Sequence, residues 1–258
     1  AAVLRGTQIL ANITHTQLIH EAYGGVVPEL ASRAHIEHIV PVVKRAMETA
    51  NVTLKDIDAI AFTQGPGLMG SLVVGTSFAK GLALALNKPL IGVHHMKAHI
   101  LSHFISHEGM TAPTFPYLCL TVSGGHTQIV VVHDALNMEI IGKTIDDAAG
   151  EAFDKSAKVL GLGYPGGPAL AALATQGDAN AFKLPRPLLH SGDLDFSFAG
   201  LKTAVMVQFN KLGDAPTPQQ RADLAASTQA AIVEVLVKKS LAAVKAVGAN
   251  RLVDKDKN

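Results

Sequence analysis

A histidine pair that directly follows an apolar stretch constrains the fold of this chain more than any other feature. Residues 90–93 have the length of a short strand, and His95 and His99 follow at a spacing of four residues. Residues four apart lie on one face of a helix, so the two imidazoles can reach the same ion. Open α/β sheets bind their ligands beyond the carboxyl ends of the strands. The stretch therefore predicts an α/β fold with a site at this strand end.

The two histidines alone leave their role open. Imidazole suits zinc and ferrous iron, but a metal site usually needs a third protein ligand. The chain has 12 histidines, and an isolated pair at this spacing is more often a pair of surface or core residues. His103 lies one turn further along, where we expect an exposed histidine rather than a substitute ligand. The position after a strand favours the metal interpretation for His95 and His99.

Composition predicts a folded chain without a strongly charged surface. The 258 residues are 48% hydrophobic and 17% charged, with a formal net charge of +1, so binding to RNA would need a local basic patch or a partner subunit. Cys119 is the single cysteine, which excludes an intrachain disulfide and predicts a core residue. The uninterrupted apolar run 82–86 is too short to span a bilayer, and residues 1–6 lack the layout of a secretory signal. We expect a soluble cytoplasmic protein with no membrane contact.

Helices and strands alternate in the first half of the chain. A strand is expected near residues 9–13, a helix from Pro28, and a buried strand over residues 56–62. The glycine-rich loop 65–72 then opens another helix; because it lacks the Lys-Ser/Thr ending of a P-loop, it predicts a tight connection rather than a nucleotide site. We place the boundary between two lobes at residues 112 and 113, which gives lobes 1–112 and 113–258.

The second half begins with a predicted hairpin. Residues 117–122 and 128–132 are apolar, and the turn 123–127 between them carries two glycines. Glycines let the backbone approach a ligand and point N–H groups at a phosphate, and the hydroxyls of Ser123 and Thr127 are further candidate donors. The alternative is a plain hairpin without a ligand.

An acidic segment and a glycine cluster follow the hairpin. Residues 145–158 begin with acidic side chains, which favours the start of a helix. Residues 161–168 predict a rigid turn cluster that can wall a pocket. Two pairs at helical spacing predict surface ion pairs: Glu151 with Lys155, and Asp154 with Lys158.

The last third of the chain predicts core aromatics and a long helix. Phe196 and Phe198 are expected in the core. Residues 217–247 carry apolar side chains at helical spacing, with Pro218 near the start and Gly248 after the end.

Taken together and in order, these segments resemble the tRNA N6-adenosine threonylcarbamoyltransferase family of the bacterial TsaD type, which also carries the older label O-sialoglycoprotein endopeptidase, or glycoprotease. The resemblance covers nearly the whole chain. It rests on seven segments: residues 23–33, 65–70, 93–99, 121–127, 146–155, 164–168 and 195–203.

The resemblance implies a two-lobed fold of the actin/Hsp70/sugar-kinase type, with a ribonuclease H-like sheet in each lobe. It implies transfer of the threonylcarbamoyl group from threonylcarbamoyl-AMP to N6 of adenosine 37 in tRNAs that read codons starting with A. It also implies one divalent metal ion, Fe²⁺ or Zn²⁺, and threonylcarbamoyl-AMP or ATP as the adenylate ligand. The implied partners are tRNA and either a metal-less paralogue with a small ATPase or a second copy of the chain, the latter in mitochondrial relatives.

The resemblance also implies roles for particular residues. His95 and His99 correspond to the metal-binding, catalytic histidines. The positions that hold the adenylate correspond to Thr121, Val122, Ser123, Gly124, Gly125, Asp154 and Gly167.

The family pattern continues beyond both ends of these 258 residues. A first strand with a Glu-Thr-Ser-Cys-Asp-Glu-Thr-like loop, an Ala-Gly-Gly-Val-x-x-Asn adenosine loop and an aspartate metal ligand have no counterpart here. On the sequence as written we expect weak metal binding and little or no transferase activity.

Three other interpretations compete with the transferase. A metal-dependent glycoprotein endopeptidase is disfavoured, because Met96 and Lys97 stand where an H-E-x-x-H peptidase has its glutamate. A sugar or acetate kinase of the same fold has no use for the histidine pair. For an inactive scaffold subunit, the presence of His95 and His99 weighs against the interpretation, and the family segments without a counterpart here weigh in its favour.

Overall fold

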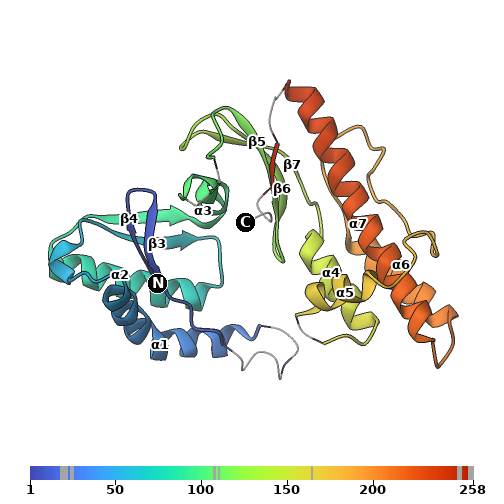
Figure 1. The fold of residues 1–258 in the computed structure, drawn as a ribbon, viewed down its shortest axis with the longest axis horizontal. Coiled ribbons are helices and arrows are strands. Elements are labelled where there is room, and N and C mark those ends of the chain that lie inside the picture. The colour runs from blue at the N-terminus through green and yellow to red at the C-terminus, as the bar shows by residue number, and fades with distance from the viewer. Residues whose placement is uncertain are drawn as a thin grey trace. The chain divides into compact units, whose positions relative to one another are not determined.

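The computed structural model describes residues 1–17, 23, 26–106, 109, 111–163, 165–248 and 252–254. The chain divides into unit 1, Ala1–Pro113, and unit 2, Thr114–Asn258 (Figure 1). The predicted boundary falls one residue before this division. Both units contain helices and strands, which confirms the α/β class.

Unit 1 begins with a hairpin and a long helix. Strands β1 (Ala2–Arg5) and β2 (Gln8–Asn12) pair antiparallel around Gly6, whose φ of 60° suits the tight turn. Helix α1 (Pro28–Thr49) begins at the predicted proline, where the missing N–H costs nothing. Of the family-like segment 23–33, Gly24 and Gly25 lie outside the described residues.

A parallel strand–helix–strand unit follows. Strand β3 (Ile60–Gly65), helix α2 (Met69–Leu86) and strand β4 (Leu90–His94) form it, and β3 pairs with β4. The strand predicted over residues 56–62 starts four residues late. The reason is the short helix η2 (Leu54–Asp56), in which the Asp56 carboxylate accepts hydrogen bonds from the Thr53 N–H and hydroxyl.

The unit ends with two short helices, α3 (His95–Leu101) and η3 (Ser102–Phe104). The predicted order of strand and histidine helix is confirmed, because β4 ends at His94 and α3 begins at the next residue. Helix α2, with a mean hydropathy of 1.5, is the one helix of the described residues that is long and apolar enough to cross a membrane. The core helix of a soluble protein meets the same criterion, so this is weak support for a membrane contact.

Unit 2 is built on a four-stranded sheet of order β7-β6-β5-β8. Its strands are β5 (Tyr117–Val122), β6 (Thr127–Val132), β7 (Met138–Lys143) and β8 (Leu252–Asp254). The pairing of β5 with β6 is antiparallel, from Val122 opposite Thr127 to Tyr117 opposite Val132, which confirms the predicted hairpin. Strand β8 lies parallel to β5 on the other side.

Four helices complete unit 2: α4 (Ala149–Val159), α5 (Gly166–Ala174), α6 (Ala199–Lys211) and α7 (Pro218–Val247), the last drawn in red in Figure 1. Helix α7 confirms its sequence signals: Thr217 and Gln220 form a capping box, and Gly248 ends the helix in a left-handed conformation. The predicted turn cluster at residues 161–168 is wrong in its second half. Gly166, Gly167 and Pro168 form the first turn of α5, where proline is tolerated.

The large core of the chain lies in unit 2. Phe196 and Phe198 are fully buried as predicted, with ring centroids 6.2 Å apart, and Cys119 is buried in β5. The two phenylalanines belong to a core cluster with apolar side chains from the sheet and all four helices.

Candidate functional site

The histidine pair of unit 1 has the geometry of a two-ligand metal site. The Nε2 atoms of His95 and His99 lie 3.1 Å apart on α3. Two imidazole nitrogens that bind one ion at about 2.0–2.1 Å in near-tetrahedral geometry lie roughly 3.3 Å apart. The observed separation therefore fits a shared ion, and the pairing follows from the four-residue spacing on a helix that starts at the strand end.

The pair supplies only part of a metal shell. Within the ranges that the structure describes, no group of three His, Cys, Asp or Glu side chains is arranged to hold an ion. His103 differs from the prediction of an exposed histidine: it is 7% exposed, because η3 turns it inward. The remaining ligands of a bound ion would have to come from water, a substrate or residues beyond this group.

The hairpin turn of unit 2 is held in shape by its own serine. The Ser123 N–H donates to the His126 carbonyl at 2.8 Å, and the Ser123 hydroxyl accepts from the N–H groups of Gly125 and His126. The same hydroxyl donates to the His126 carbonyl at 3.2 Å. The sequence predicted this hydroxyl as a ligand donor, but the structure commits it to the turn.

The turn is fixed against the amino end of α4. The Ala149 N–H donates to the Thr127 hydroxyl at 2.9 Å, and the Gly150 N–H donates to the Ser123 carbonyl at 3.2 Å. Thr127 is fully buried, so its hydroxyl caps the helix from a neighbouring strand rather than facing a ligand as predicted. A Cβ at Gly150 would lie 2.7 Å from the Ser123 carbonyl, so glycine is required for this contact.

The exposed part of the turn is its backbone. Gly124 and Gly125 are exposed, and a Cβ at either position would meet open space. Because glycine has no side chain, an anion can come close to the backbone of this turn, next to the amino end of a helix. Thr121 is buried with its hydroxyl 3.3 Å from the Gln128 carbonyl, and Val122 is half-buried, so these two predicted residues support the turn.

Asp154 joins α4 to the amino end of α5. Its Oδ1 accepts a hydrogen bond from the Gly167 N–H at 2.9 Å, instead of serving the predicted pair with Lys158. Asp154 lies one turn after Gly150 on α4, so it faces the same side as the hairpin turn. A carboxylate has capacity for further hydrogen bonds at its second oxygen. Of the predicted residues near it, Tyr164 lies outside the described residues.

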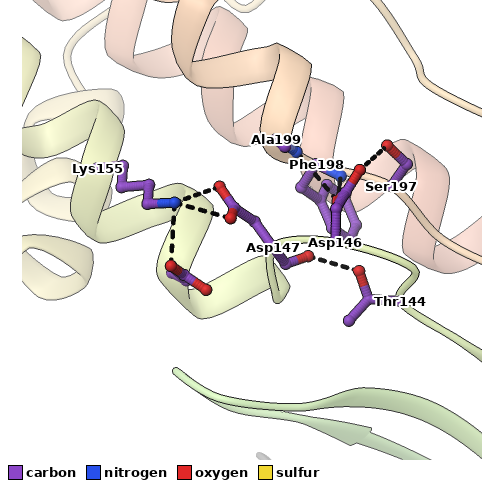
Figure 2. Close-up of polar contacts among 8 residues, drawn as sticks. Thr144, Asp146, Asp147, Lys155, Ser197, Phe198 and Ala199 are labelled. Carbon is purple, nitrogen blue, oxygen red and sulfur yellow. Dashed lines mark hydrogen bonds and ion pairs between the residues drawn. The ribbon is translucent and has the colours of Figure 1, made fainter.

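Asp146 and Asp147, just before α4, form a network of hydrogen bonds and ion pairs that the sequence did not predict (Figure 2). The Asp146 carboxylate accepts hydrogen bonds from the Ser197 hydroxyl at 2.5 Å and from the N–H groups of Phe198 and Ala199 at 2.8 and 3.1 Å. It thereby caps α6 from a position more than 50 residues away in sequence. No local sequence signal could have shown this contact.

Asp147 forms the other part of this network through an ion pair with Lys155. Both of its carboxylate oxygens lie 2.7 Å from the Lys155 ammonium (Figure 2). The same ammonium lies 3.0 Å from a carboxylate oxygen of Glu151. The predicted pair of Glu151 and Lys155 is confirmed, but the stronger partner is Asp147, eight residues away. The hydrogen bonds that Lys155 donates, first to Asp147 and second to Glu151, raise the pKa of Lys155.

The pKa of Asp146 reflects two opposing effects. Partial burial acts to raise it, while the hydrogen bonds from Ser197, Phe198 and Ala199 act to lower it. The hydrogen bonds prevail, so the pKa lies below the usual carboxyl value and the residue stays ionised in neutral solution. An ionised Asp146 is what the amino end of α6 needs as a cap.

Unit 2 has an α/β framework, an exposed glycine turn beside the amino end of α4, and a carboxylate on α4 that accepts a hydrogen bond from the amino end of α5. Such features are found in proteins that hold a phosphate-bearing ligand. Unit 1 adds a paired-imidazole helix of the kind found in metal enzymes. The fold of both units defines the class as a mixed α/β protein.

Comparisons with known proteins identify the family. The family model described as "TsaD: tRNA N6-adenosine threonylcarbamoyltransferase" matches residues 8–255, and the chain belongs to this family of transferases. The tRNA N6-adenosine threonylcarbamoyltransferase of Acidovorax sp. (strain JS42) is 60% identical over 246 residues, which cover 95% of this chain and 69% of the relative. The protein of the same name from Paracidovorax citrulli (strain AAC00-1) is 59% identical, over 95% of this chain and 70% of its own.

Proposed function

We propose that the chain transfers a threonylcarbamoyl group from threonylcarbamoyl-AMP to N6 of adenosine 37 in tRNAs that read codons starting with A. Membership of the family supports this activity. The observation that carries the proposal is the contact between Gly150 and the Ser123–Gly124 backbone, which exposes a glycine turn at the amino end of a helix. The proposal includes the family's two-lobed actin/Hsp70/sugar-kinase fold with ribonuclease H-like sheets.

The adenylate half of the donor is assigned to unit 2. The bare backbone at Gly124 and Gly125 suits the phosphate of the adenylate, because N–H groups there can donate without a side chain in the way. The free oxygen of Asp154 suits a ribose hydroxyl, which donates to a carboxylate. ATP would use the same contacts.

The reaction needs positioning more than activation. The donor is a mixed anhydride, so attack by N6 on the carbamoyl carbonyl carbon forms the new C–N bond, and AMP leaves with the electron pair of the broken C–O bond. N6 loses a proton in the process. Residues that hold the leaving phosphate also stabilise the charge that develops on it, and holding both reactants in line accounts for much of the rate.

His95 and His99 are assigned to one divalent ion, Fe²⁺ or Zn²⁺. The 3.1 Å separation of their Nε2 atoms supports this. When bound, such an ion supplies Lewis-acid polarisation of a carbonyl. The histidines themselves hold the ion, and their place at the start of α3 ties them to the end of β4.

The endopeptidase of the older family label is less well supported. Between the histidines, Met96 is buried and Lys97 is a base only when it loses its charge. A metallopeptidase of this helical type uses a glutamate there as its general base. The remaining assignments of partners and location follow the family: tRNA, a metal-less paralogue with a small ATPase or a second copy, and the cytoplasm, or mitochondria in a eukaryote.

The test measures donor binding and transfer separately. AMP binding is followed by calorimetry for the unchanged chain, for Asp154→Ala and for the control Asp214→Ala, an exposed residue after α6. We expect Asp154→Ala to weaken AMP binding about tenfold or more, as expected for a lost hydrogen bond to a charged group. The control should bind like the unchanged chain.

Transfer is followed with threonylcarbamoyl-AMP and a tRNA transcript, with labelled threonine as the readout. The label should enter a transcript with adenosine 37 and fail to enter one with guanosine there. Failure of AMP to bind would refute the assignment of the glycine turn, and equal labelling of both transcripts would refute the acceptor.

A further inference from the structure

A buried lysine on α7 has no part in the reaction proposed above. The side chain of Lys239 is 3% exposed, whereas that of its neighbour Lys238 is 54% exposed and forms an ion pair with Glu234. Removing an ammonium group from water has a large desolvation cost, and lysine is almost never fully buried unless it is paired. The burial of Lys239 therefore points to a specific set of partners.

The partners of Lys239 lie in the irregular connection between α5 and α6. Its Nζ lies 2.9 Å from the Ser191 hydroxyl, 2.7 Å from the Asp193 carbonyl oxygen and 3.2 Å from the Asp193 carboxylate. An ammonium group has three N–H donors, so all three can be satisfied here. Hydrogen bonds from Ser191 first and from Lys239 second lower the pKa of Asp193, so the contact joins two opposite charges in neutral solution.

The chain after Asp193 is bonded to the end of β7. The Asp193 carboxylate accepts a hydrogen bond from the Asp195 N–H at 3.1 Å, and the Asp195 carboxylate accepts one from the Lys143 N–H at 3.0 Å. The Phe196 N–H donates to the Lys143 carbonyl at 2.9 Å, and the Phe196 carbonyl accepts from the Ile145 N–H at 3.0 Å. Residues 191–198, which we call the anchored segment, therefore lie along the chain that leads from β7 to α4.

The other end of the anchored segment is held by Asp146. As described above, its carboxylate accepts hydrogen bonds from Ser197, Phe198 and Ala199 (Figure 2). Asp146 lies just before α4, whose Gly150 contacts the glycine turn. The anchored segment thus connects the buried ammonium of α7 with the residues that support the glycine turn.

The same short stretch before α4 is also bonded directly to the hairpin. The N–H groups of Thr144 and Ala149 donate to the carbonyl and the hydroxyl of Thr127, both at 2.9 Å. A shift of this stretch would therefore move the amino end of α4 relative to the glycine turn.

We propose that Lys239 is a positioning residue for the adenylate site. Its ammonium fixes the anchored segment, and through Asp146 the segment fixes the amino end of α4 against the glycine turn. The proposal rests on the proposed function, in which the glycine turn holds the phosphate of the adenylate.

The need for a charged anchor follows from the local structure. Residues 175–198, between α5 and α6, have no helix or strand of their own, and a connection of this length is uncommon in a compact domain unless it has a function. Leu188 has a φ of 52° and Gly192 a φ of 85°, so the chain bends through left-handed conformations beside the lysine contacts. An apolar side chain at position 239 could fill the space, but it could not bind Asp193.

The experiment compares two adjacent lysines. Hydrogen–deuterium exchange is measured without ligand for the unchanged chain, for Lys239→Met and for the control Lys238→Met. In Lys239→Met we expect exchange tenfold faster or more at the N–H groups of Phe198, Ala199 and Gly150, because the segment loses its anchor, with little change in β5 and β6. Lys238→Met should exchange like the unchanged chain.

Calorimetry with AMP then separates positioning from general stability. Lys239→Met should bind AMP about fivefold more weakly or worse. Thr217→Ala, which loses the capping box of α7 and touches no part of the anchored segment, should keep its AMP affinity. If Lys239 acts through Asp146, the two effects are not additive, so Lys239→Met should change the AMP affinity of an Asp146→Asn variant less than twofold.

A second variant keeps the test independent of whether Lys239→Met folds. Asp193→Asn removes the charge of the partner, whose side chain is 54% exposed, and should give the same pattern with smaller changes.

Three outcomes would overturn the proposal: unchanged exchange at Phe198, Ala199 and Gly150, an equal loss of AMP affinity in Thr217→Ala, or additive losses in the double variant. If the unchanged chain does not bind AMP, the proposed function fails by itself. The exchange measurement without ligand then decides whether Lys239 positions the turn.

Discussion

The two units bury their apolar side chains to very different degrees. In unit 2, β5 and β6 are buried along almost their whole length, and the twelve largest fully buried side chains of the described residues all belong to this unit. Among the described residues of unit 1, the buried apolar residues are five alanines, Met96 and Ile100. Yet the strand sequences are similar: residues 90–93 are apolar, and Ile91 is still 49% exposed.

The difference shows what a strand needs besides an apolar sequence. Uninterrupted apolar strands are typical of sheets that are covered on both sides and paired at both edges. Strand β5 has β6 and β8 as neighbours and a helical layer with large side chains. Within the part of the chain that the structure describes, strands β3 and β4 pair only with each other. Pairing with neighbouring strands and coverage by helices, rather than the local sequence, therefore determine how far the side chains of a strand are buried.

The largest expected effect compares two leucines on helices. Leu170 is fully buried in α5, whereas Leu82 on α2 lines a cavity of about 1300 Å³ in unit 1. Leu170→Ala should lower the free energy of unfolding of unit 2 by about 3–4 kcal/mol, whereas Leu82→Ala should cost unit 1 about 1 kcal/mol, because fewer contacts are lost. Urea denaturation with hydrogen exchange assigns each loss to its unit. Equal losses would show that the two units are equally well packed.

The next effect compares two glycines. Gly150→Ala places a Cβ 2.7 Å from the Ser123 carbonyl and should cost about 1–3 kcal/mol and weaken AMP binding. Gly81→Ala, in the middle of α2 with open space around it, should raise stability by about 0.5–1 kcal/mol through helix propensity. Thermal melts and calorimetry give both readouts. An unchanged AMP affinity in Gly150→Ala would separate the turn from the binding site.

A smaller effect concerns the loss of stability at low pH, which we compare for one aspartate in each unit. The pKa values of Asp146 in unit 2 and of Asp56 in unit 1 are both lowered, Asp146 against the effect of its partial burial and Asp56 mainly by hydrogen bonds from Thr53. A lowered carboxyl pKa stabilises the fold above the ordinary value of 3.8, and that stability is lost as the pH falls through the folded pKa. Asp146→Asn should cost about 1 kcal/mol at neutral pH, a value reduced for solvent screening, and should flatten the acid limb of the stability curve.

Asp56→Asn is the matched change in unit 1. Its carboxylate caps a single short turn, so we expect a smaller change in the same pH window. Urea midpoints between pH 3 and pH 7 compare the two. A larger acid response from Asp56 would mean that the fold of unit 1 depends on its loops more than on its sheet.

The smallest effects concern helix starts. Thr217→Ala removes the capping box of α7 and should cost about 0.5–1 kcal/mol. Helix α1 starts after Val27, which offers no side-chain cap, so Val27→Ser should gain a few tenths of a kcal/mol. Thermal melts of each variant would show a shift of opposite sign. A loss in Val27→Ser would indicate that the valine packs on α1.

The sequence predicted helices and strands well where their formation depends on residues close together in the chain. The four-residue spacing of His95 and His99 and the flanks of α7 at Thr217 and Gly248 were sufficient, because capping and helical periodicity involve neighbouring residues. The resemblance of the segments to one family also came from the sequence, and the family match confirms it.

The failures involve contacts between distant residues. The glycines at 166 and 167 were assigned to a turn, yet they begin α5, because Asp154 accepts the Gly167 N–H. The hydroxyls of Ser123 and Thr127 were candidate ligand donors, with a plain hairpin as the alternative, and in the structure the turn and α4 use them. Asp146 caps a helix start more than 50 residues away. A side chain with several possible partners is assigned only when the fold brings one of them within reach.

The sequence by itself determined the alternation of helices and strands in unit 1, the hairpin and long helix of unit 2, the histidine pair and the family, because these depend on spacing along the chain. Only the tertiary structure decided which hydroxyls are occupied, which glycines have no room for a side chain, and which strands pair with each other. Those properties depend on backbone groups of distant segments, whose hydrogen bonds carry no trace in the local pattern of side chains.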